Sequence, residues 1–217
     1  MPVRQQQTPA PAEISYCVAV IPSNAMKSSV ATASMAITRS FENDNIIDNV
    51  RFPAHISLYL GGTVRDQVPL LVDEIRKAIQ SHLSEKLRAT RLYSGHGGFI
   101  GVEIEDDNNV KALFEAVMGA CARVHQAKPY VRPHLISRWP RMRQDQRELI
   151  EQLGTYKTDA SDLHISVAQV DAQDLDAAFV VAQKHFSFPA EFGIDSLQIV
   201  DVGHNNEKWT VLWSSGA

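Results

Sequence analysis

The sequence lacks the features that mark several protein classes. It has only two cysteines, Cys17 and Cys121, which lie in apolar segments without C-x-x-C spacing. This argues against a disulfide framework and fits buried free thiols in a reducing cytosol. No apolar stretch approaches the roughly 20 residues that a membrane-spanning helix needs. The opening residues, MPVRQQQTPAPAE, have no apolar core of the kind found in signal peptides. These absences predict a cytoplasmic protein with no membrane association.

Motifs that would hold a metal or a cofactor are also missing. No cluster has zinc-ligand spacing, there is no G-x-S-x-G, and the segment SGHGG lacks the lysine of a P-loop. A positive charge excess is absent as well, since the formal net charge is −4. That charge argues against a general electrostatic binder of nucleic acid, so any nucleotide site must come from a local patch. We therefore expect no metal and no cofactor.

What is present is enough apolar sequence for a packed core, at 44% of the residues. Residues 1–13, rich in Gln, Pro and Ala, predict a flexible tail. Residues 14–217 are expected to form a single bilobal domain. Hydrophobic periodicity predicts strands over residues 14–21, 55–62, 87–93, 99–104, 164–170, 192–202 and 208–213. It predicts helices over residues 28–41, 66–84, 108–125, 141–153 and 174–186.

These elements repeat in order. The order strand, helix, strand, helix and hairpin occurs twice. In the second repeat, the segment Tyr130 to Trp139 takes the place of the first strand. Hairpins and crossover helices together predict an α+β fold. We expect two pseudo-symmetric lobes of antiparallel-rich sheets, with helices on the outer faces and an active-site cleft between the lobes.

The tripeptide His-Ile-Ser occurs twice, at His55 to Ser57 and at His164 to Ser166, and each copy opens an apolar strand. Residues i and i+2 of a strand point to the same face, so each copy presents an imidazole beside a hydroxyl. Two such copies on opposite walls of one cleft would supply two proton-transfer groups and two hydrogen-bond donors.

The bare pattern H-x-S is weak in this chain, because four of the eight histidines match it. His82 and His185, however, lie near the ends of segments with helical spacing, where residues i and i+2 do not share a face. Only the pair at His55 and His164 can therefore project histidine and serine together. The alternative, that both are core or edge histidines without chemistry, is less favoured for a matched pair than for either one alone.

The paired H-x-[ST] strands, the bilobal element order and the final hairpin resemble the 2H phosphoesterase superfamily, over about residues 14–213. This resemblance implies 2′,3′-cyclic phosphodiesterase or 2′-5′ RNA ligase-like activity without a metal. His55 and His164 would be the acid–base pair, and Ser57 and Ser166 would bind phosphate oxygens. Histidine suits such work because its ordinary pKa lies near neutral pH. The sequence leaves open which histidine is the base.

Five further residues are candidates for substrate binding. Tyr59 follows the first motif and could stack on a nucleobase, although packing within the sheet is an equal alternative. The basic and aromatic segment KPYVRPHLISRWPRMR contains Tyr130, Arg132, Arg138 and Trp139, which could line the cleft. A solvated helix start with a core tryptophan is an equal alternative for this segment.

The leading hypothesis is a phosphodiesterase for 2′,3′-cyclic phosphates or 2′-5′-linked nucleotides. Its partner would be a nucleotide or short RNA substrate, and the protein is expected to be a monomer without an obligatory protein partner. One alternative is a nucleotide- or RNA-binding module with the same cleft and little turnover. Another is a structural α+β protein in which the two motifs are coincidental.

Overall fold

The computed structural model describes residues 13–82, 86–157, 159–203 and 208–216. Residues 1–12 of the expected tail lie outside this range. Glu13, the last residue of that expected tail, is the first residue of a strand.

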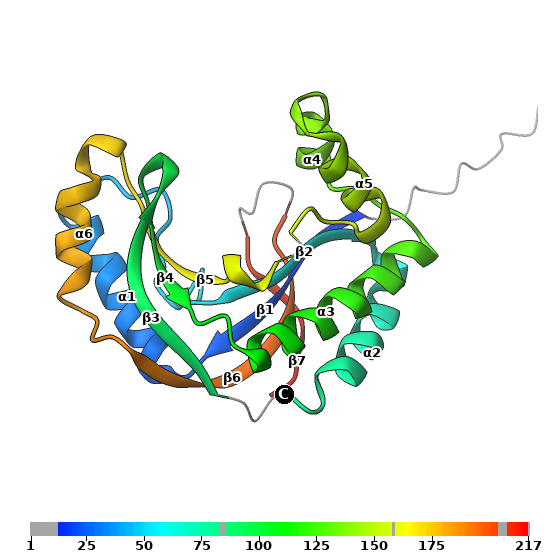
Figure 1. The fold of residues 1–217 in the computed structure, drawn as a ribbon, viewed down its shortest axis with the longest axis horizontal. Helices are drawn as coiled ribbons and strands as arrows, with labels where there is room; N and C mark the ends of the chain where they lie inside the picture. The colour runs from blue at the N-terminus through cyan, green and yellow to red at the C-terminus, as the bar shows by residue number, and fades with distance from the viewer. Residues whose placement is uncertain (1–12, 83–85, 158, 204–207, 217) are drawn as a thin grey trace, which may run out of the picture.

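Seven antiparallel strands form one sheet (Figure 1). They are β1 (Glu13–Pro22), β2 (Ile56–Val64), β3 (Lys86–Gly95), β4 (Phe99–Ile104), β5 (His164–Gln169), β6 (Ala190–Asp201) and β7 (Thr210–Ser214). Their order is β1-β2-β5-β4-β3-β6-β7, and β1 also pairs with β6. Strand β6 contacts β3 with its first residues and both β1 and β7 with its later ones, so the sheet has two halves that share β6. The motif strands β2 and β5 join the halves on the other side.

Two helix pairs cover the outside of the sheet (Figure 1). The helices are α1 (Asn24–Thr38), α2 (Val68–Ile79), α3 (Asn108–Ala127), α4 (Pro133–Arg138), α5 (Gln144–Leu153) and α6 (Leu175–Gln183). Helix α3 packs on α2 and β2, whereas α1 packs on α6 and β5. The expected α+β class, with an antiparallel sheet and outer helices, is confirmed. No helix within the described ranges is long and apolar enough to cross a membrane.

Helix α3 shows how sequence spacing produces these layers. Val110, Leu113, Val117 and Val124 recur at steps of three, four and seven residues and are all buried. The Asp107 side chain accepts a hydrogen bond from the Val110 N–H at 2.8 Å, which satisfies one of the open donors at the helix start. The expected helix over residues 108–125 is therefore confirmed to within two residues.

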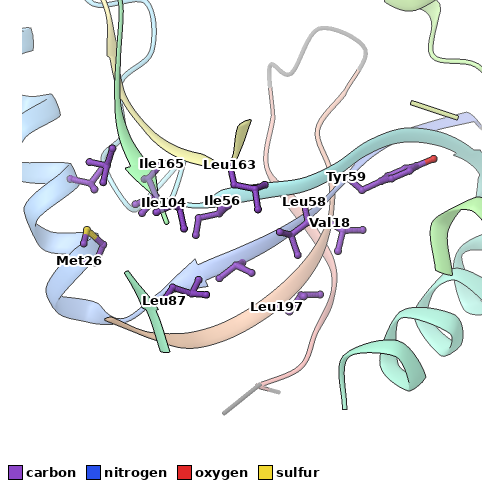
Figure 2. Close-up of a cluster of buried hydrophobic side chains, with 14 of the residues drawn as sticks. Val18, Met26, Ile56, Leu58, Tyr59, Leu87, Ile104, Leu163, Ile165 and Leu197 are labelled. Carbon is purple, nitrogen blue, oxygen red and sulfur yellow. The ribbon is translucent and has the colours of Figure 1, made fainter. Parts of the chain in front are cut away.

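The central residue of each H-I-S motif is part of the main hydrophobic core. Ile56 and Ile165 are buried and lie among core residues that include Ile104 and Leu163 (Figure 2). Full burial of an isoleucine side chain contributes roughly 1.5–3 kcal/mol. Because the isoleucine side chains turn inward, the histidine and serine on either side of each must turn to the opposite face of the strand.

One element of the expected repeat is wrong. Residues 130–139 do not form a strand, because Pro133 begins the short helix α4. Proline fits the first position of a helix, since its missing N–H would have no partner there and its φ is already helical. The segment therefore leaves the sheet, and α4 and α5 project together beside it (Figure 1). The second half of the chain has no counterpart of β1 at this position.

Candidate active site

The two H-I-S motifs are direct neighbours in the sheet. Strands β2 and β5 run antiparallel, and the pair between them is Ile56 with Ile165. Extending this register by one residue places His55 beside Ser166 and Ser57 beside His164. All four side chains line one cavity of about 1270 Å³. The motifs thus form the floor of the cavity side by side, rather than facing each other from opposite walls as the sequence suggested.

Both motif strands contain a β-bulge directly after the serine. In β2, Ser57 pairs with Ala19 and Tyr59 with Val18, which leaves Leu58 as the extra residue. In β5, Ser166 pairs with Gly101 and Ala168 with Ile100, so that Val167 is extra. A bulge reverses the facing pattern beyond it and bends the strand. Each strand therefore presents its His and Ser to the cavity and then returns its next residues to the core.

Both histidines are oriented by the same main-chain contact. The Nδ1 atom of His55 lies 2.9 Å from the Pro53 carbonyl oxygen, and Nδ1 of His164 lies 2.9 Å from the Asp162 carbonyl oxygen. A carbonyl can only accept, so each Nδ1 must carry the proton and donate it. Within the described residues neither Nε2 has a hydrogen-bond partner. In the neutral state each Nε2 is therefore an acceptor that can take a proton from a bound molecule.

His55 is packed against an indole. The centroids of the His55 and Trp209 rings lie 4.4 Å apart, with 46° between the ring planes. The pKa of His55 is lowered to about 4, mainly by burial; the Pro53 carbonyl opposes this shift, and the charge of His164 adds to it. In the absence of a bound anion, His55 is therefore neutral at pH 7.

His164 has a different set of neighbours. Two aromatic rings stand nearly perpendicular to its own, Phe99 at 5.1 Å and 74° and Tyr93 at 6.3 Å and 78° between ring centroids and planes. Burial is the main cause that lowers the pKa of His164, and the charge of Lys157 acts in the same direction. The carbonyl and the carboxylate of Asp162 both raise this pKa. A carboxylate acts in this way on His164, whereas His55 has only a carbonyl in that role.

Ser57 has a thiol behind it. The Sγ atom of Cys17 lies 3.5 Å from Ser57 Oγ and donates a weak hydrogen bond to it. Burial raises the pKa of Cys17 to about 11, so the thiol keeps its proton at neutral pH. With its oxygen accepting from Cys17, the hydroxyl of Ser57 can direct its own proton toward the cavity. Cys17, expected to be a buried free thiol, is buried and free as predicted.

Several positive side chains line the same cavity. Arg132 is only 2% exposed, and Arg138 and Lys157 lie along the wall with it. Three further cations of the lining are paired with carboxylates: Arg51 with Asp48 at 3.1 Å, Arg91 with Glu103 at 2.6 Å, and Lys208 with Asp201 at 2.8 Å. The charges of Lys157 and Arg132 both act at the Cys17 thiol, which places them near Ser57. The carboxylates of Asp44, Asp159 and Asp162 line the cavity too, so the positive charge that suits an anion is the local charge of Lys157 and Arg132 near Ser57.

The basic and aromatic segment divides into two parts. Arg132 and Arg138 line the cavity, as the sequence suggested. Tyr130 and Trp139 are not among the lining residues. The Tyr130 hydroxyl instead donates to the Glu13 carboxylate at 2.8 Å, and its ring covers Gly62, where a Cβ would clash with it. Tyr130 thus ties the start of β1 to β2 and is not placed to contact a substrate.

The expectation that Tyr59 stacks on a nucleobase is wrong. Tyr59 is 0% exposed, its ring stacks on Tyr16 at 5.5 Å, and its hydroxyl donates to the Leu153 carbonyl at 2.6 Å. Simple alternation would put Tyr59 on the same face as Ser57, but the bulge at Leu58 turns it into the core. Leu60 lines the cavity in its place.

Four residues of the site were not anticipated from the sequence. Trp209, Phe99 and Tyr93 contact the histidines, and Lys157 lies between the motifs. The aromatic residues belong to the two hairpins, which were expected, but nothing in the chain's periodicity shows that hairpin residues reach the motif strands. Lys157 follows a helix in an irregular segment and carries no local signal.

Within the residues that the structure describes, no group of three or more His, Cys, Asp or Glu side chains is placed to hold a metal ion.

No protein-family model matches the chain, and no curated protein matches it. Among solved structures, the chain is similar to that of Kluyveromyces marxianus Usb1 with uridine monophosphate. The TM-score is 0.40 and the identity is 12%, over 92% of this chain and 96% of that chain.

Proposed function

We propose that this protein is a phosphodiesterase that hydrolyses 2′,3′-cyclic phosphate or 2′-5′-linked nucleotide or RNA substrates by two-histidine acid–base catalysis, without a metal. One observation carries the proposal. Two imidazoles, each held through Nδ1 by the carbonyl two residues before it, line the same cavity beside each other's serine. Hydrolysis of a phosphodiester needs one group that takes a proton from the attacking water and a second group that gives a proton to the leaving oxygen, and two histidines can fill these roles.

The reaction on a cyclic phosphate needs two proton transfers. One Nε2 accepts a proton from water, whose oxygen forms a new bond to phosphorus. The bond between phosphorus and one ribose oxygen breaks, and the second histidine gives its Nε2 proton to that oxygen. The product is a nucleoside monophosphate, and the two histidines end in exchanged protonation states.

The surroundings of the two histidines suggest which one is the base and which one is the acid. His55, whose pKa is lowered to about 4, stays neutral and is suited to be the base. His164 lies near the Asp162 carboxylate, which favours its charged form, and it is suited to be the acid. A bound phosphate would raise the pKa of both imidazoles, because a negative charge stabilises the protonated ring.

The rest of the floor would stabilise the charge that develops on the phosphate. The hydroxyls of Ser57 and Ser166 can donate to the two non-bridging oxygens, where the negative charge grows in the transition state. Arg132 and Arg138 add positive charge along the wall and would hold further phosphates of a longer substrate. The cavity is large enough for a nucleotide and for part of a short RNA.

The proposal is tested by incubating the protein with a nucleoside 2′,3′-cyclic phosphate in EDTA and resolving the 2′- and 3′-monophosphate products. Turnover is expected to resist EDTA and to be lost in His55→Ala and in His164→Ala. His185→Ala is the matched control, because His185 also belongs to an H-x-S tripeptide but lies outside the cavity. It should retain wild-type activity.

The alternatives give different results in the same assay. A folded protein that turns over neither the cyclic phosphate nor a 2′-5′-linked dinucleotide would contradict the proposal. If such a protein still binds nucleotides in the cavity, the binding-module alternative is favoured. Activity that survives both histidine substitutions would instead show that the motifs are not the catalytic groups.

A further inference from the structure

Lys157 connects the two motifs through their main chains. Its Nζ atom donates to the carbonyl oxygen of Ser57 and to that of Asp162, each at 3.3 Å. The Asp162 carbonyl is also the acceptor that orients the His164 ring at 2.9 Å. A single side chain therefore holds the first motif and the group that positions the histidine of the second.

The same nitrogen lies at the cavity. Lys157 lines it, although much of the side chain is buried. An ammonium has three N–H donors, and the two carbonyls use two of them. The third is therefore left for an oxygen atom in the cavity. This nitrogen contacts the main chain of Ser57 in the first motif and of Asp162, two residues before His164, in front of the second. An oxygen atom that accepts the third N–H would therefore belong to a group bound between the two motifs.

We propose that Lys157 is the fixed cation of the site, which donates its third N–H to a non-bridging phosphate oxygen and positions His164 through the Asp162 carbonyl. This inference rests on the proposed function, to which it adds a residue. Lys157 would act differently from the two serines, because its fixed positive charge acts both on the phosphate and on the neighbouring imidazole. No counterpart of Lys157 lies at the Pro53 carbonyl among the described residues.

The charge of Lys157 should also set how readily His164 releases its proton. A nearby cation disfavours a second positive charge, and Lys157 lowers the pKa of His164 accordingly. The other ionisable groups around His164 are Asp162 on its own segment, Tyr93 on β3, and His55 on the neighbouring motif. Glu103 on β4 pairs with His164 in the sheet, and its carboxylate is neutralised by Arg91. Burial still lowers the pKa of His164 when the Lys157 charge is removed, but one of the causes that lower it is gone, so this pKa should rise.

The experiment uses inorganic phosphate as the probe, so that it does not depend on turnover. Phosphate affinity and the pKa of the His164 ring are measured by NMR titration in wild type, Lys157→Gln and Lys157→Met. Loss of one hydrogen bond to a charged group corresponds to about 10- to 100-fold weaker binding. The pKa of His164 should rise in both variants, whereas Lys157→Arg should keep it low. Thermal unfolding confirms that each variant is folded.

Lys184→Gln is the matched control. Lys184 is exposed and does not line the cavity, so the variant removes one positive charge away from the site and both readouts should stay at their wild-type values. The inference is overturned if folded Lys157→Gln and Lys157→Met bind phosphate as wild type does and leave the His164 pKa unchanged. It is also overturned if wild type binds no phosphate. If phosphate binding weakens as expected but no substrate is hydrolysed, the cation assignment stands and the phosphodiesterase proposal fails.

Discussion

The first and second H-I-S motifs agree in main-chain geometry and differ in their side-chain surroundings. Each has a histidine whose Nδ1 donates to the carbonyl two residues before it, an isoleucine in the core, and a bulge after the serine. Against this common frame, His55 contacts the Trp209 ring, and no carboxylate among the described residues acts on its pKa. His164 packs against the rings of Phe99 and Tyr93, which are nearly perpendicular to it, and lies near Asp162 and Lys157.

This comparison separates the features that form the pair of histidines from the features that make one the acid and the other the base. The shared geometry places two equivalent nitrogen atoms at one cavity, which by itself would not distinguish acid from base. Burial lowers both pKa values, and the unshared neighbours add effects that differ between the two histidines. We infer that strand geometry supplies the pair, and that the hairpins and the segment before β5 supply the difference between its members.

The largest expected effect comes from removing either imidazole. His55→Ala and His164→Ala should each lower the rate of cyclic phosphate hydrolysis about 10²- to 10⁴-fold, because each removes one proton transfer. Steady-state kinetics with a nucleoside 2′,3′-cyclic phosphate measures this. Loss of activity in one variant alone would break the comparison, since it would mean that only one motif takes part.

The serines should have a smaller and similar effect. Ser57→Ala and Ser166→Ala each remove a hydrogen bond to a charged oxygen, which corresponds to about 10- to 100-fold in kcat/KM. The Cys17 contact makes the two serines unequal, because it orients the hydroxyl of Ser57. Cys17→Ala should therefore lower activity slightly, and only while Ser57 is present. An equal effect of Cys17→Ala in the Ser57→Ala background would contradict this role.

The pH dependence of kcat/KM should show a maximum on the acidic side of neutrality. Activity rises with pH as His55 loses its proton, around pH 4, because the base must be neutral. It falls as the pH passes the pKa of His164, which burial lowers from its ordinary value near 6.5. In kcat the falling limb should move to higher pH, since bound phosphate raises the pKa of the acid. A maximum above pH 7.5 in kcat/KM would be inconsistent with these surroundings.

The aromatic neighbours allow each limb to be shifted separately. Trp209→Ala should expose His55 to water, raise its pKa and move only the acidic limb to higher pH. Phe99→Ala should expose His164 and move only the alkaline limb to higher pH. Trp213→Phe is a control, because Trp213 lies near Arg76 and does not contact either histidine. If both limbs move together in either variant, the two histidines do not have separate environments.

The smallest effect concerns stability and not catalysis. Tyr59→Phe removes the hydrogen bond to the Leu153 carbonyl and should lower the free energy of unfolding by about 1 kcal/mol. Chemical denaturation measures this loss. Because Tyr59 lies in the core, KM for the cyclic phosphate should stay the same. A raised KM in the folded variant would restore the stacking role that the structure takes from Tyr59.

Much of the fold could be predicted because it depends on local patterns. The three- and four-residue apolar spacing of α3 and the turn-forming segments of the hairpins act within short stretches of chain. The expected strand at residues 130–139 failed because a single residue, Pro133, favoured a helix start over the apolar run that follows it.

The site could be predicted only in part, for a related reason. The alternation of side chains along a strand holds over the three residues of each motif. It was therefore enough to predict the positions of His55, Ser57, His164 and Ser166. Tyr59 was misplaced because a bulge, which no local pattern marks, falls between it and Ser57. Lys157 and Trp209 reach the motifs through contacts between segments far apart in the chain, and such contacts follow from the packing of the whole sheet.

The central claim is that the two motifs act as one catalytic unit, and the double variant His55→Ala/His164→Ala tests it most directly. Its rate of hydrolysis of a nucleoside 2′,3′-cyclic phosphate is measured beside the rates of the two single variants. Groups that act as a unit show strongly non-additive losses. We therefore predict that the double variant is about as slow as either single variant. Losses that multiply, so that the double variant is slower by the product of the two single effects, would show that the histidines act independently and would contradict the account.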